Sequence, residues 1–316
     1  MSNLKKQLKG KENFGVVAMM VVFIAIVVAL SGSSFFTTKN IANLLRSVSV
    51  MGIMSCAVTL IMVTGNIDLS LGWMIGFCAV ITGQHSGNFG EAIFWAILAG
   101  IGCGAFNGFL VGILKLNAFI ATLGTMYAFK GITTLYSDGR FVTKLAPSEV
   151  LKFVGQGEIG GIPTPIIIFA LFAIIFWFLL KKTEFGTKVY AVGANQRSAH
   201  FSGIRAWLIV LVVYTLAGLA TGVAGTVLYA KVMSVQPYSG VGLEFDVLTA
   251  VVLGGTSVTG GKGNVLGTIL GVIFVGILSN GFTLIGLGSN ATYITQGIVL
   301  LIAMWADVKS SGGVRS

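Results

Sequence analysis

Apolar runs long enough to cross a lipid bilayer recur along almost the whole chain, and they restrict its possible folds more than any other feature. A transmembrane helix needs about 20 residues to span ~30 Å of hydrocarbon. Of the 316 residues, 55% are hydrophobic and 9% are charged, whereas a soluble domain carries about 25% charged residues. We therefore expect an all-α integral membrane protein with a single polytopic domain over residues 14–308.

Ten apolar segments are expected to cross the membrane as helices. The first follows a Lys-rich start, and because no cleavage motif with a soluble domain behind it follows, we expect it to be retained. The eighth is too short to cross the hydrocarbon unaided and could be re-entrant. A short amphipathic segment, 35–46, is expected to lie in the interface, and a polar loop at 137–163. The ten spans cover about residues 14–34, 47–64, 71–87, 91–114, 118–136, 164–180, 207–230, 246–258, 264–285 and 292–306.

The distribution of cations predicts the orientation. Ten spans place both termini on one side, which receives 13 Lys and Arg side chains against 7 on the other. Because basic residues accumulate in cytoplasmic loops, the tails 1–13 and 309–316 and the segment 181–205 are predicted to be cytoplasmic. The net charge of +10 is dispersed between apolar runs with no aromatic–basic stretch. This pattern excludes nucleic acid as a partner and indicates membrane lipid instead.

Residues 181–205 form a polar, basic interruption in this apolar chain. Phe185, Val189 and Val192 recur at i, i+4 and i+7, which predicts one apolar stripe on a short helix. Gly193 and Ala194 are expected to break that helix. The segment could be a docking element for a soluble partner, or an ordinary cytoplasmic loop whose Lys and Arg only fix the orientation.

A second short helix is expected directly after this break. Asn195 can cap it by accepting a hydrogen bond from the amide of Arg197 or Ser198. Gly203 can end it by taking a left-handed conformation. The sequence therefore predicts two short helices, joined by a turn, at the membrane surface.

Two segments of the chain echo each other. Val-Thr-Gly at 63–65 is followed by Leu-Gly at 71–72 and then Gly76, and Val-Thr-Gly at 258–260 by Leu-Gly at 266–267 and then Gly271. Repeats with broken helices near the substrate path are common in transporters. We expect an internal parallel repeat with broken helices, although one short match can also arise by chance in a Gly-rich chain.

Glycines recur every four residues on two spans, at 100, 104, 108 and 112 and at 263, 267 and 271. Small residues at this spacing let helices approach closely in lipid. The ridges indicate either a moving helix interface or static packing.

The residues needed for covalent chemistry or metal binding are scarce. The only histidines are His85 and His200, so no Ser-His-Asp set and no metal-ligand cluster can be assembled. The Gly-Gly-Lys at 260–262 lacks the first Gly and the final Ser or Thr of a phosphate-binding loop. We expect no catalytic residue, no metal and no cofactor in this chain, so any ATP must be hydrolysed by another subunit.

Polar residues near helix breaks and within spans are the candidates for a solute pathway. An ionisable group at a helix break, such as Asp68, is a functional candidate, but Asp68 or Ser70 could equally cap the third span. The other candidates could equally form hydrogen bonds between helices. The pathway candidates are Asn66, Asp68, Ser70, Asn107, Thr122 and Asn280.

Two acidic residues precede the eighth span in the same way. Glu244 and Asp246 could cap that span, or could face a partner on the outer side. The ten acidic residues of the chain lie mostly at span ends and in loops. Because an ion-coupled carrier usually has several acidic or His residues within its spans, this distribution favours a pathway for a neutral, hydroxylated solute.

Three stretches of the sequence resemble the ribose-type permease subunits of bacterial ABC importers. GNIDLSLG at 65–72 is similar to the GGIDLSVG of that family. AVGAN at 191–195, with FSGI at 201–204, is similar to its A-x-G-G-N…SGI segment. AVVLGGTS at 250–257, with GGKG at 260–263, is similar to its AVVLGGTS…GGKG stretch. The resemblance is colinear over nearly the full chain.

The resemblance implies an inner-membrane permease that imports ribose or a related monosaccharide. It implies a second permease copy or paralogue, a periplasmic sugar-binding protein, and a cytoplasmic ATPase whose two nucleotide-binding domains hold ATP and Mg. It also implies that 183–204 is the ATPase-coupling loop. The coupling residues are then Thr183, Phe185, Gly186, Gly193, Asn195, Ser198, Ala199, Ser202 and Gly203.

Three positions depart from the family pattern. Asn66 and Ala194 each replace a Gly, and Gln196 stands where an acidic residue is usual. The last departure puts an ion pair from that position to the ATPase in doubt. The rival interpretations are an ion-coupled secondary carrier or channel acting alone, and a membrane enzyme, which the missing nucleophile–base sets disfavour.

Overall fold

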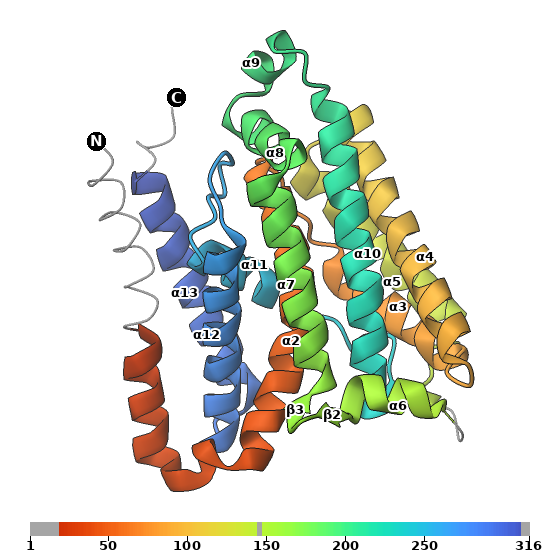
Figure 1. Cartoon of the computed structure of the whole chain (residues 1–316), viewed down its shortest axis with the longest axis vertical. Coiled ribbons are helices and arrows are strands. Elements are labelled where there is room, and N and C mark those ends of the chain that lie inside the picture. The colour runs from red at the N-terminus through yellow and green to blue at the C-terminus, as the bar shows by residue number, and fades with distance from the viewer. Residues whose placement is uncertain (1–18, 144–146, 311–316) are drawn as a thin grey trace.

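The computed structural model describes residues 19–143 and 147–310, and the predicted tail 1–13 lies outside these ranges. Most of the helices run along the long axis of an elongated bundle (Figure 1). Residues 19–31 are helical. The helices after them are η1 (a 3-10 turn, Gly32–Phe36), α2 (Thr38–Val63), α3 (Leu71–Gln84), α4 (Phe89–Gly108), η2 (a π-helical turn, Phe109–Ile113), α5 (Ala118–Tyr136), α6 (Glu149–Gln156), α7 (Thr164–Lys182), α8 (Glu184–Ala194), α9 (Gln196–Phe201), α10 (Ala206–Val232), α11 (Leu243–Leu253), α12 (Val265–Leu284) and α13 (Gly288–Ser310).

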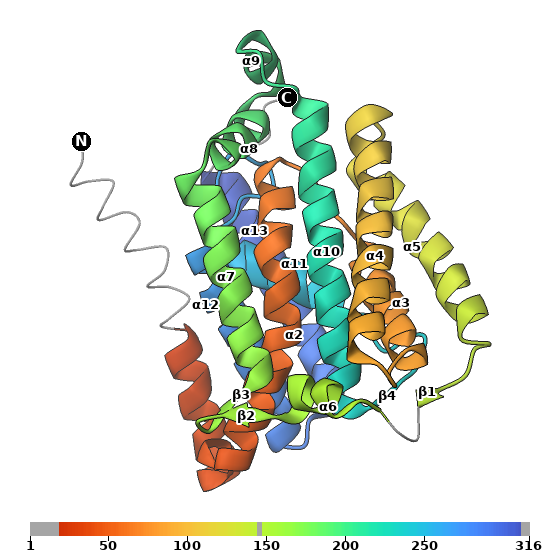
Figure 2. The same ribbon diagram turned by 45° about the vertical axis from the view of Figure 1, so that its right-hand side comes forward.

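The strands are four two-residue pieces. β1 (Val142–Thr143) pairs antiparallel with β4 (Ser234–Val235), and β2 (Glu158–Ile159) pairs antiparallel with β3 (Ile162–Pro163). All four lie with α6 at one end of the bundle, and α8 and α9 lie at the other end (Figure 2). The protein is thus an all-α membrane protein with two minimal ladders.

Six described helical segments are long and apolar enough to cross a membrane. Two shorter apolar helices, Leu71–Gln84 and Asn290–Trp305, accompany them. The observed bounds agree with most of the predicted spans to within a few residues, and the predicted short eighth span corresponds to the 11-residue α11. The six long segments are Met19–Phe36, Thr38–Val63, Phe89–Ile113, Thr164–Lys182, Ala206–Val232 and Val265–Leu284.

Residues 35–46 do not form the separate segment that was predicted. The chain turns through η1, and α2 then runs unbroken from Thr38 to Val63. Thr37 caps this helix by accepting from the amide of Asn40 at 3.4 Å. No Gly or Pro lies between positions 38 and 51 to end the helix, so the polar residues there form its first turns.

The predicted polar loop at 137–163 contains a helix that the sequence prediction missed. α6 lies across the end of the bundle (Figure 1). Leu151 is fully buried on its inner face, and a Cβ on Gly155 would overlap the backbone of Ala230 on α10. This one-sided packing holds an eight-residue helix that would be marginal alone.

α2 lies at the centre of the bundle. Every residue from Val48 to Val63 is buried, because α7, α10, α11 and α12 all contact this helix. Only a helix that is apolar on all its faces can take such a position.

α4 and α10 pack through glycine. A Cβ on Gly100 would overlap the carbonyl oxygen of Gly218, and a Cβ on Gly104 would overlap that of Tyr214. The predicted ridge on α4 therefore faces α10 and permits backbone-to-backbone contact.

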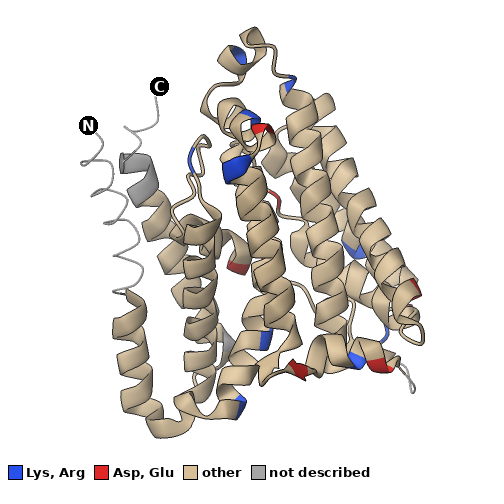
Figure 3. Ribbon diagram, viewed as in Figure 1, with Lys and Arg blue, Asp and Glu red and all other residues tan. Residues whose placement is uncertain are grey.

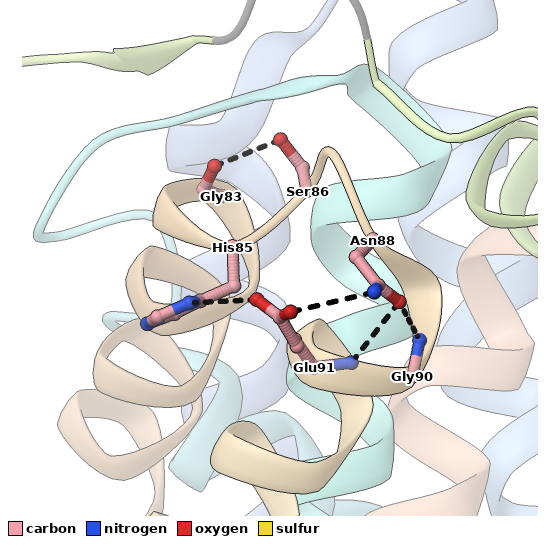
Figure 4. Close-up of polar contacts among 6 residues, drawn as sticks. All are labelled: Gly83, His85, Ser86, Asn88, Gly90 and Glu91. Carbon is pink, nitrogen blue, oxygen red and sulfur yellow. Dashed lines mark hydrogen bonds and ion pairs between the residues drawn. The ribbon is translucent and has the colours of Figure 1, made fainter.

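Most charged residues lie towards the two ends of the bundle, and a few lie along its middle (Figure 3). The turn from α3 to α4 shows how the end distant from α8 is closed (Figure 4). Asn88 caps α4 by accepting from the amides of Gly90 at 2.9 Å and Glu91 at 3.4 Å. His85 Nδ1 lies 3.9 Å from Glu91 Oε2, and the Ser86 hydroxyl donates to the Gly83 carbonyl at 2.8 Å.

Two alanine substitutions on α4 test the glycine contact. Gly104→Ala should destabilise the protein by about 1–3 kcal/mol, because its Cβ meets the α10 backbone. The control, Gly102→Ala, places its Cβ in open space on the same helix and should stabilise the helix by about 0.5–1 kcal/mol. Denaturant unfolding in detergent measures both changes, and equal effects of the two substitutions would contradict the packing argument.

Candidate functional site

The segment 183–204 folds into two short helices, which we call the α8–α9 hairpin. The Thr183 hydroxyl caps α8 by accepting from the amide of Gly186 at 3.3 Å. Asn195 caps α9 by accepting from the amide of Ser198 at 2.9 Å. Gly203 follows α9 with φ of 79°, where L side chains are strained. The two helices, the Asn195 cap and the left-handed Gly203 are confirmed. The break predicted at Gly193 and Ala194 is wrong, because both residues lie within α8, which ends at Ala194.

The inner face of the hairpin packs against the bundle. Val189 and Val192 are almost fully buried, as is Ala199 on α9, and Phe185 packs against the same core. Gly186 is also buried, and a Cβ on it would overlap the carbonyl oxygen of Leu180 on α7. The predicted apolar stripe thus fixes α8 to the end of the bundle.

α8 contacts two distant segments of the chain at Gly193 and Tyr190. A Cβ on Gly193 would overlap the carbonyl oxygen of Val63, the last residue of α2. That oxygen accepts from the amide of Gly261 at 2.9 Å. The Tyr190 hydroxyl donates to the Gly263 carbonyl at 2.7 Å. Burial raises the pKa of this hydroxyl, so the tyrosine stays neutral and donates its proton to the bond. The two echoing segments, 63–72 and 258–267, therefore meet beside α8.

The tip of the hairpin, residues 197–205, is largely exposed. The Phe201 ring is 87% exposed, and Ser198, Ser202, Gly203, Arg197 and Arg205 are exposed around it. Neither Phe201, which begins the FSGI motif, nor Tyr190 was among the predicted coupling residues. An aromatic residue in a polar, basic loop is the signal that could have found Phe201.

Between α2 and α3 the chain crosses the interior without helical structure, and we call residues 64–70 the break. Asp68 is 1% exposed. Its Oδ1 accepts from the amide of Ser70 at 2.9 Å and from the Ser70 hydroxyl at 2.7 Å. The Asn107 amide on α4 donates to Asp68 Oδ2 at 3.3 Å and to Ser70 Oγ at 2.8 Å. Three of the predicted pathway residues thus form one buried cluster.

Two further side chains hold the backbone of the break. The Thr122 hydroxyl on α5 accepts from the amide of Leu69 at 3.1 Å. The Tyr214 hydroxyl on α10 donates to the Ile67 carbonyl at 2.8 Å. Asn66 lies apart and donates to the Thr64 hydroxyl at 2.9 Å. The break is therefore tied to α4, α5 and α10, and a tyrosine hydroxyl inside an apolar span is the signal that could have found Tyr214.

The predicted cap of α3 has a different form. Asp68 bonds the amide of Ser70, which is the residue before the helix, and the Ser70 side chain makes no cap bond to α3. The carboxylate therefore closes a turn in front of α3.

Asn280 lies away from this cluster. It exchanges two hydrogen bonds with Asn40 on α2, at 2.8 and 3.0 Å. Both residues line a cavity of about 510 Å³ between α2, α10, α11, α12 and α13, and Asp246 and Tyr293 also line it. The structure thus brings Asn280 together with Asp246, which the sequence analysis had placed in a separate group.

Glu244 lies inside the protein at the start of α11. It is 4% exposed, and its Oε2 accepts from the amide of Gly242 at 2.9 Å. A Cβ on Gly72 of α3 would overlap this carboxylate. This burial favours a role at the helix start over a contact with an external partner.

No group of three or more His, Cys, Asp or Glu side chains that could hold a metal ion lies within the described parts of the chain. The site instead combines an exposed tip, a tightly packed connection and a buried polar break.

Comparisons with known proteins give consistent relatives. Residues 40–304 match the family described as branched-chain amino acid transport system / permease component. The chain is 39% identical to a ribose import permease protein of Bacillus subtilis (strain 168), over 91% of this chain and 90% of that protein. It is 33% identical to a fructose import permease protein of Rhizobium meliloti, over 87% and 79%. It is 31% identical to a D-allose transport system permease protein of Escherichia coli (strain K12), over 94% and 91%. No solved structure matches the chain.

Removal of the Tyr214 hydroxyl tests the support of the break. Tyr214→Phe leaves the Ile67 carbonyl without its donor in a buried site, so stability should fall by about 1–3 kcal/mol. The control is Tyr127→Phe, because that side chain is 62% exposed and its change should cost little. The denaturant midpoint in detergent measures both, and an unchanged midpoint for Tyr214→Phe would contradict the role given to this bond.

Proposed function

This chain belongs to the family of branched-chain amino acid transport system permease components, and we propose that it is the membrane-spanning permease subunit of an ATP-driven importer for ribose or a closely related monosaccharide. As a family member it is a transport component and not an enzyme. The substrate proposal is supported by relatives named as permeases for ribose, fructose and D-allose.

The observation that carries the proposal is the α8–α9 hairpin, which is anchored on its inner face and bare at its tip. An exposed Phe beside Arg197 and Arg205 suits a protein–protein contact, since aromatic and Arg side chains dominate such contacts. The partner would be a cytoplasmic ATPase with two nucleotide-binding domains, which would hold the ATP and Mg. We propose that the nine predicted coupling residues, from Thr183 to Gly203, form and support the contact with this partner.

The contacts of α8 support a mechanism of coupling. Closure of the ATPase would move the hairpin as a unit. Because Gly193 and Tyr190 touch the end of α2 and the 258–263 loop, the motion would reach the break and α11. Packed interfaces switch between discrete arrangements, so a small displacement there can bias inward- against outward-facing states.

The topology proposal keeps ten membrane crossings, with the short α3 and α11 as two of them and both termini on the cytoplasmic side. Among described residues, seven Lys and Arg lie at the α8–α9 end, namely Lys115, Lys181, Lys182, Lys188, Arg197, Arg205 and Lys262. The rest of the described bundle carries six, namely Lys39, Arg46, Lys130, Arg140, Lys152 and Lys231. The cytoplasmic placement of the hairpin in the bacterial inner membrane is therefore supported by the whole-chain count of 13 against 7, most of whose margin comes from the two tails.

The internal repeat stays a proposal in a modified form. The helices α2 to α5 and α10 to α13 share the order long, short, long, long, and α2 and α10, which begin the two sets, run in opposite directions (Figure 1). This order favours an inverted repeat over the predicted parallel one.

Two further partners are proposed. One is a periplasmic sugar-binding protein, and the other is a second permease copy or paralogue in the membrane. Exposed apolar side chains cover the outward faces of α5 and α13, among them Ile120, Leu135, Ile294 and Leu301. These faces would meet lipid or the second permease.

Proteoliposomes test the proposed function against a carrier that acts alone. With the ATPase, the sugar-binding protein and ATP, labelled ribose should accumulate in the lumen from the side of the sugar-binding protein. With the permease alone, no vectorial uptake should occur. Ribose uptake driven by an ion gradient without the ATPase would favour a secondary carrier and contradict the proposal.

The hairpin tip provides a sharper test. Phe201→Asp places a charge where an apolar contact is proposed, and should lower ATP-dependent uptake by about tenfold or more, equivalent to ~1.4 kcal/mol of lost contact energy. Phe201→Leu keeps the apolar character and should retain most of the uptake. Copurification of the ATPase with each variant separates lost docking from lost folding. Normal ATPase binding by Phe201→Asp would contradict a docking role for Phe201.

A further inference from the structure

Three buried polar side chains converge between α11 and α13, where the Gln296 amide interacts with the Asp246 carboxylate and three polar atoms make no close hydrogen bond. They are Asp246 Oδ1 and Thr249 Oγ1 on α11, and Gln296 Nε2 on α13. Eight side-chain atoms are unpaired in this way in the described parts of the chain, so this small region holds a large share of them. We call the region the α11–α13 seam.

Helical spacing brings these groups together. Asp246 and Thr249 are three residues apart on α11, as are Tyr293 and Gln296 on α13, so each pair shares one helix face. Thr249, Tyr293 and Gln296 line a cavity of about 200 Å³. Asp246 and Tyr293 also line the larger cavity of about 510 Å³, and Gly242 and Tyr293 border both.

The unpaired groups carry an energetic cost. Thr249 is 1% exposed and Gln296 is 6% exposed. A buried polar atom without a partner costs about 1–3 kcal/mol, and such atoms are rare in native proteins unless they serve a role. Valine at position 249 would fill similar space without this cost.

The donors and acceptors at the seam match a neutral polyhydroxylated ligand. A carboxylate only accepts hydrogen bonds, an amide nitrogen only donates them and a hydroxyl does both. Sugar hydroxyls both donate and accept, so one sugar could satisfy all three groups. The Tyr293 ring is 58% exposed and offers an apolar face to the ring carbons. Asp246 and the buried Glu244 nearby would repel an anionic solute.

The seam is also connected to the hairpin. α11 ends at Leu253, and the chain then passes through the 258–263 loop that contacts Gly193 and Tyr190 of α8. A displacement of the hairpin can therefore reach the seam through one short helix.

We infer that the α11–α13 seam is a monosaccharide-binding subsite within the permease. Asp246 accepts from sugar hydroxyls, the Gln296 amide donates to one, Thr249 bonds another, and the Tyr293 ring packs on the sugar. This inference rests on the proposed function, and it assigns sugar contacts to the permease itself in addition to any made by the binding protein.

Isosteric variants test the subsite in the complete transporter in proteoliposomes, with labelled ribose as the probe. Thr249→Val and Gln296→Leu should each lower the ratio of maximal uptake rate to half-saturating ribose concentration by tenfold or more. Because Thr249→Val removes an unpaired hydroxyl, its thermal stability should stay equal or rise. Gln296→Leu also removes the donor that faces the Asp246 carboxylate, so its stability should fall along with its uptake, and the stability readout of the subsite is taken from Thr249→Val. A merely structural role would instead lower stability with or without an effect on uptake.

Thr164→Val is the matched control. Thr164 is 8% exposed and its hydroxyl is also buried without a partner, but it lies on α7, away from the seam, so uptake should not change. Wild-type uptake by both Thr249→Val and Gln296→Leu would overturn the subsite while leaving the proposed function intact. Absence of ribose uptake by the unaltered transporter would overturn the proposed substrate instead.

Discussion

Hydrocarbon offers no hydrogen bonds, so non-helical backbone inside the bilayer must be satisfied by the protein itself. The break at 64–70 meets this constraint through side chains from four parts of the chain. Asp68 closes a turn on Ser70, Asn107 bridges the two, Thr122 accepts from Leu69 and Tyr214 donates to Ile67. These bonds satisfy the backbone at the point where the 14-residue α3 begins inside the bundle. The helices α4, α5 and α10 pack around the break and provide the side chains that form them.

The hairpin meets the bundle through an equally tight contact, which supports the coupling proposed for it. Its last helical turn in α8 leaves no room for a side chain at Gly193, because the α2 carbonyl and the Gly261 amide already occupy that space. Backbone meets backbone there, with no flexible side chain to absorb a displacement. A close-packed contact of this kind transmits movement, and it joins the start of the break to the loop that follows α11.

Much of this arrangement could be predicted from the sequence, and the reasons for the rest are physical. The length of the apolar runs predicted most of the long helices. Asn195 and Gly203 predicted the start and the end of α9. Both predictions succeeded because these signals depend only on neighbouring residues. The start of α2 was misplaced because polar residues at 38–46 suggest an interface when no neighbour is known. α6 was missed because its inner face needs Ala230 to pack against. Asp68, Ser70 and Asn107 could be predicted as functional candidates, because each is a polar residue at a helix break or within an apolar span. The role of Tyr214 and the pairing of Asn280 with Asn40 could not be predicted, because they depend on the tertiary packing of distant segments.

We propose that the hairpin, the end of α2 and the 258–263 loop move together. Amide hydrogen exchange of the full complex, with and without ATP, would detect such a joint motion. ATP should then change the protection of Gly261, Leu69 and Ser70 together with that of α8. If only α8 and α9 changed, with the break and the loop unaltered, the three segments would not be coupled.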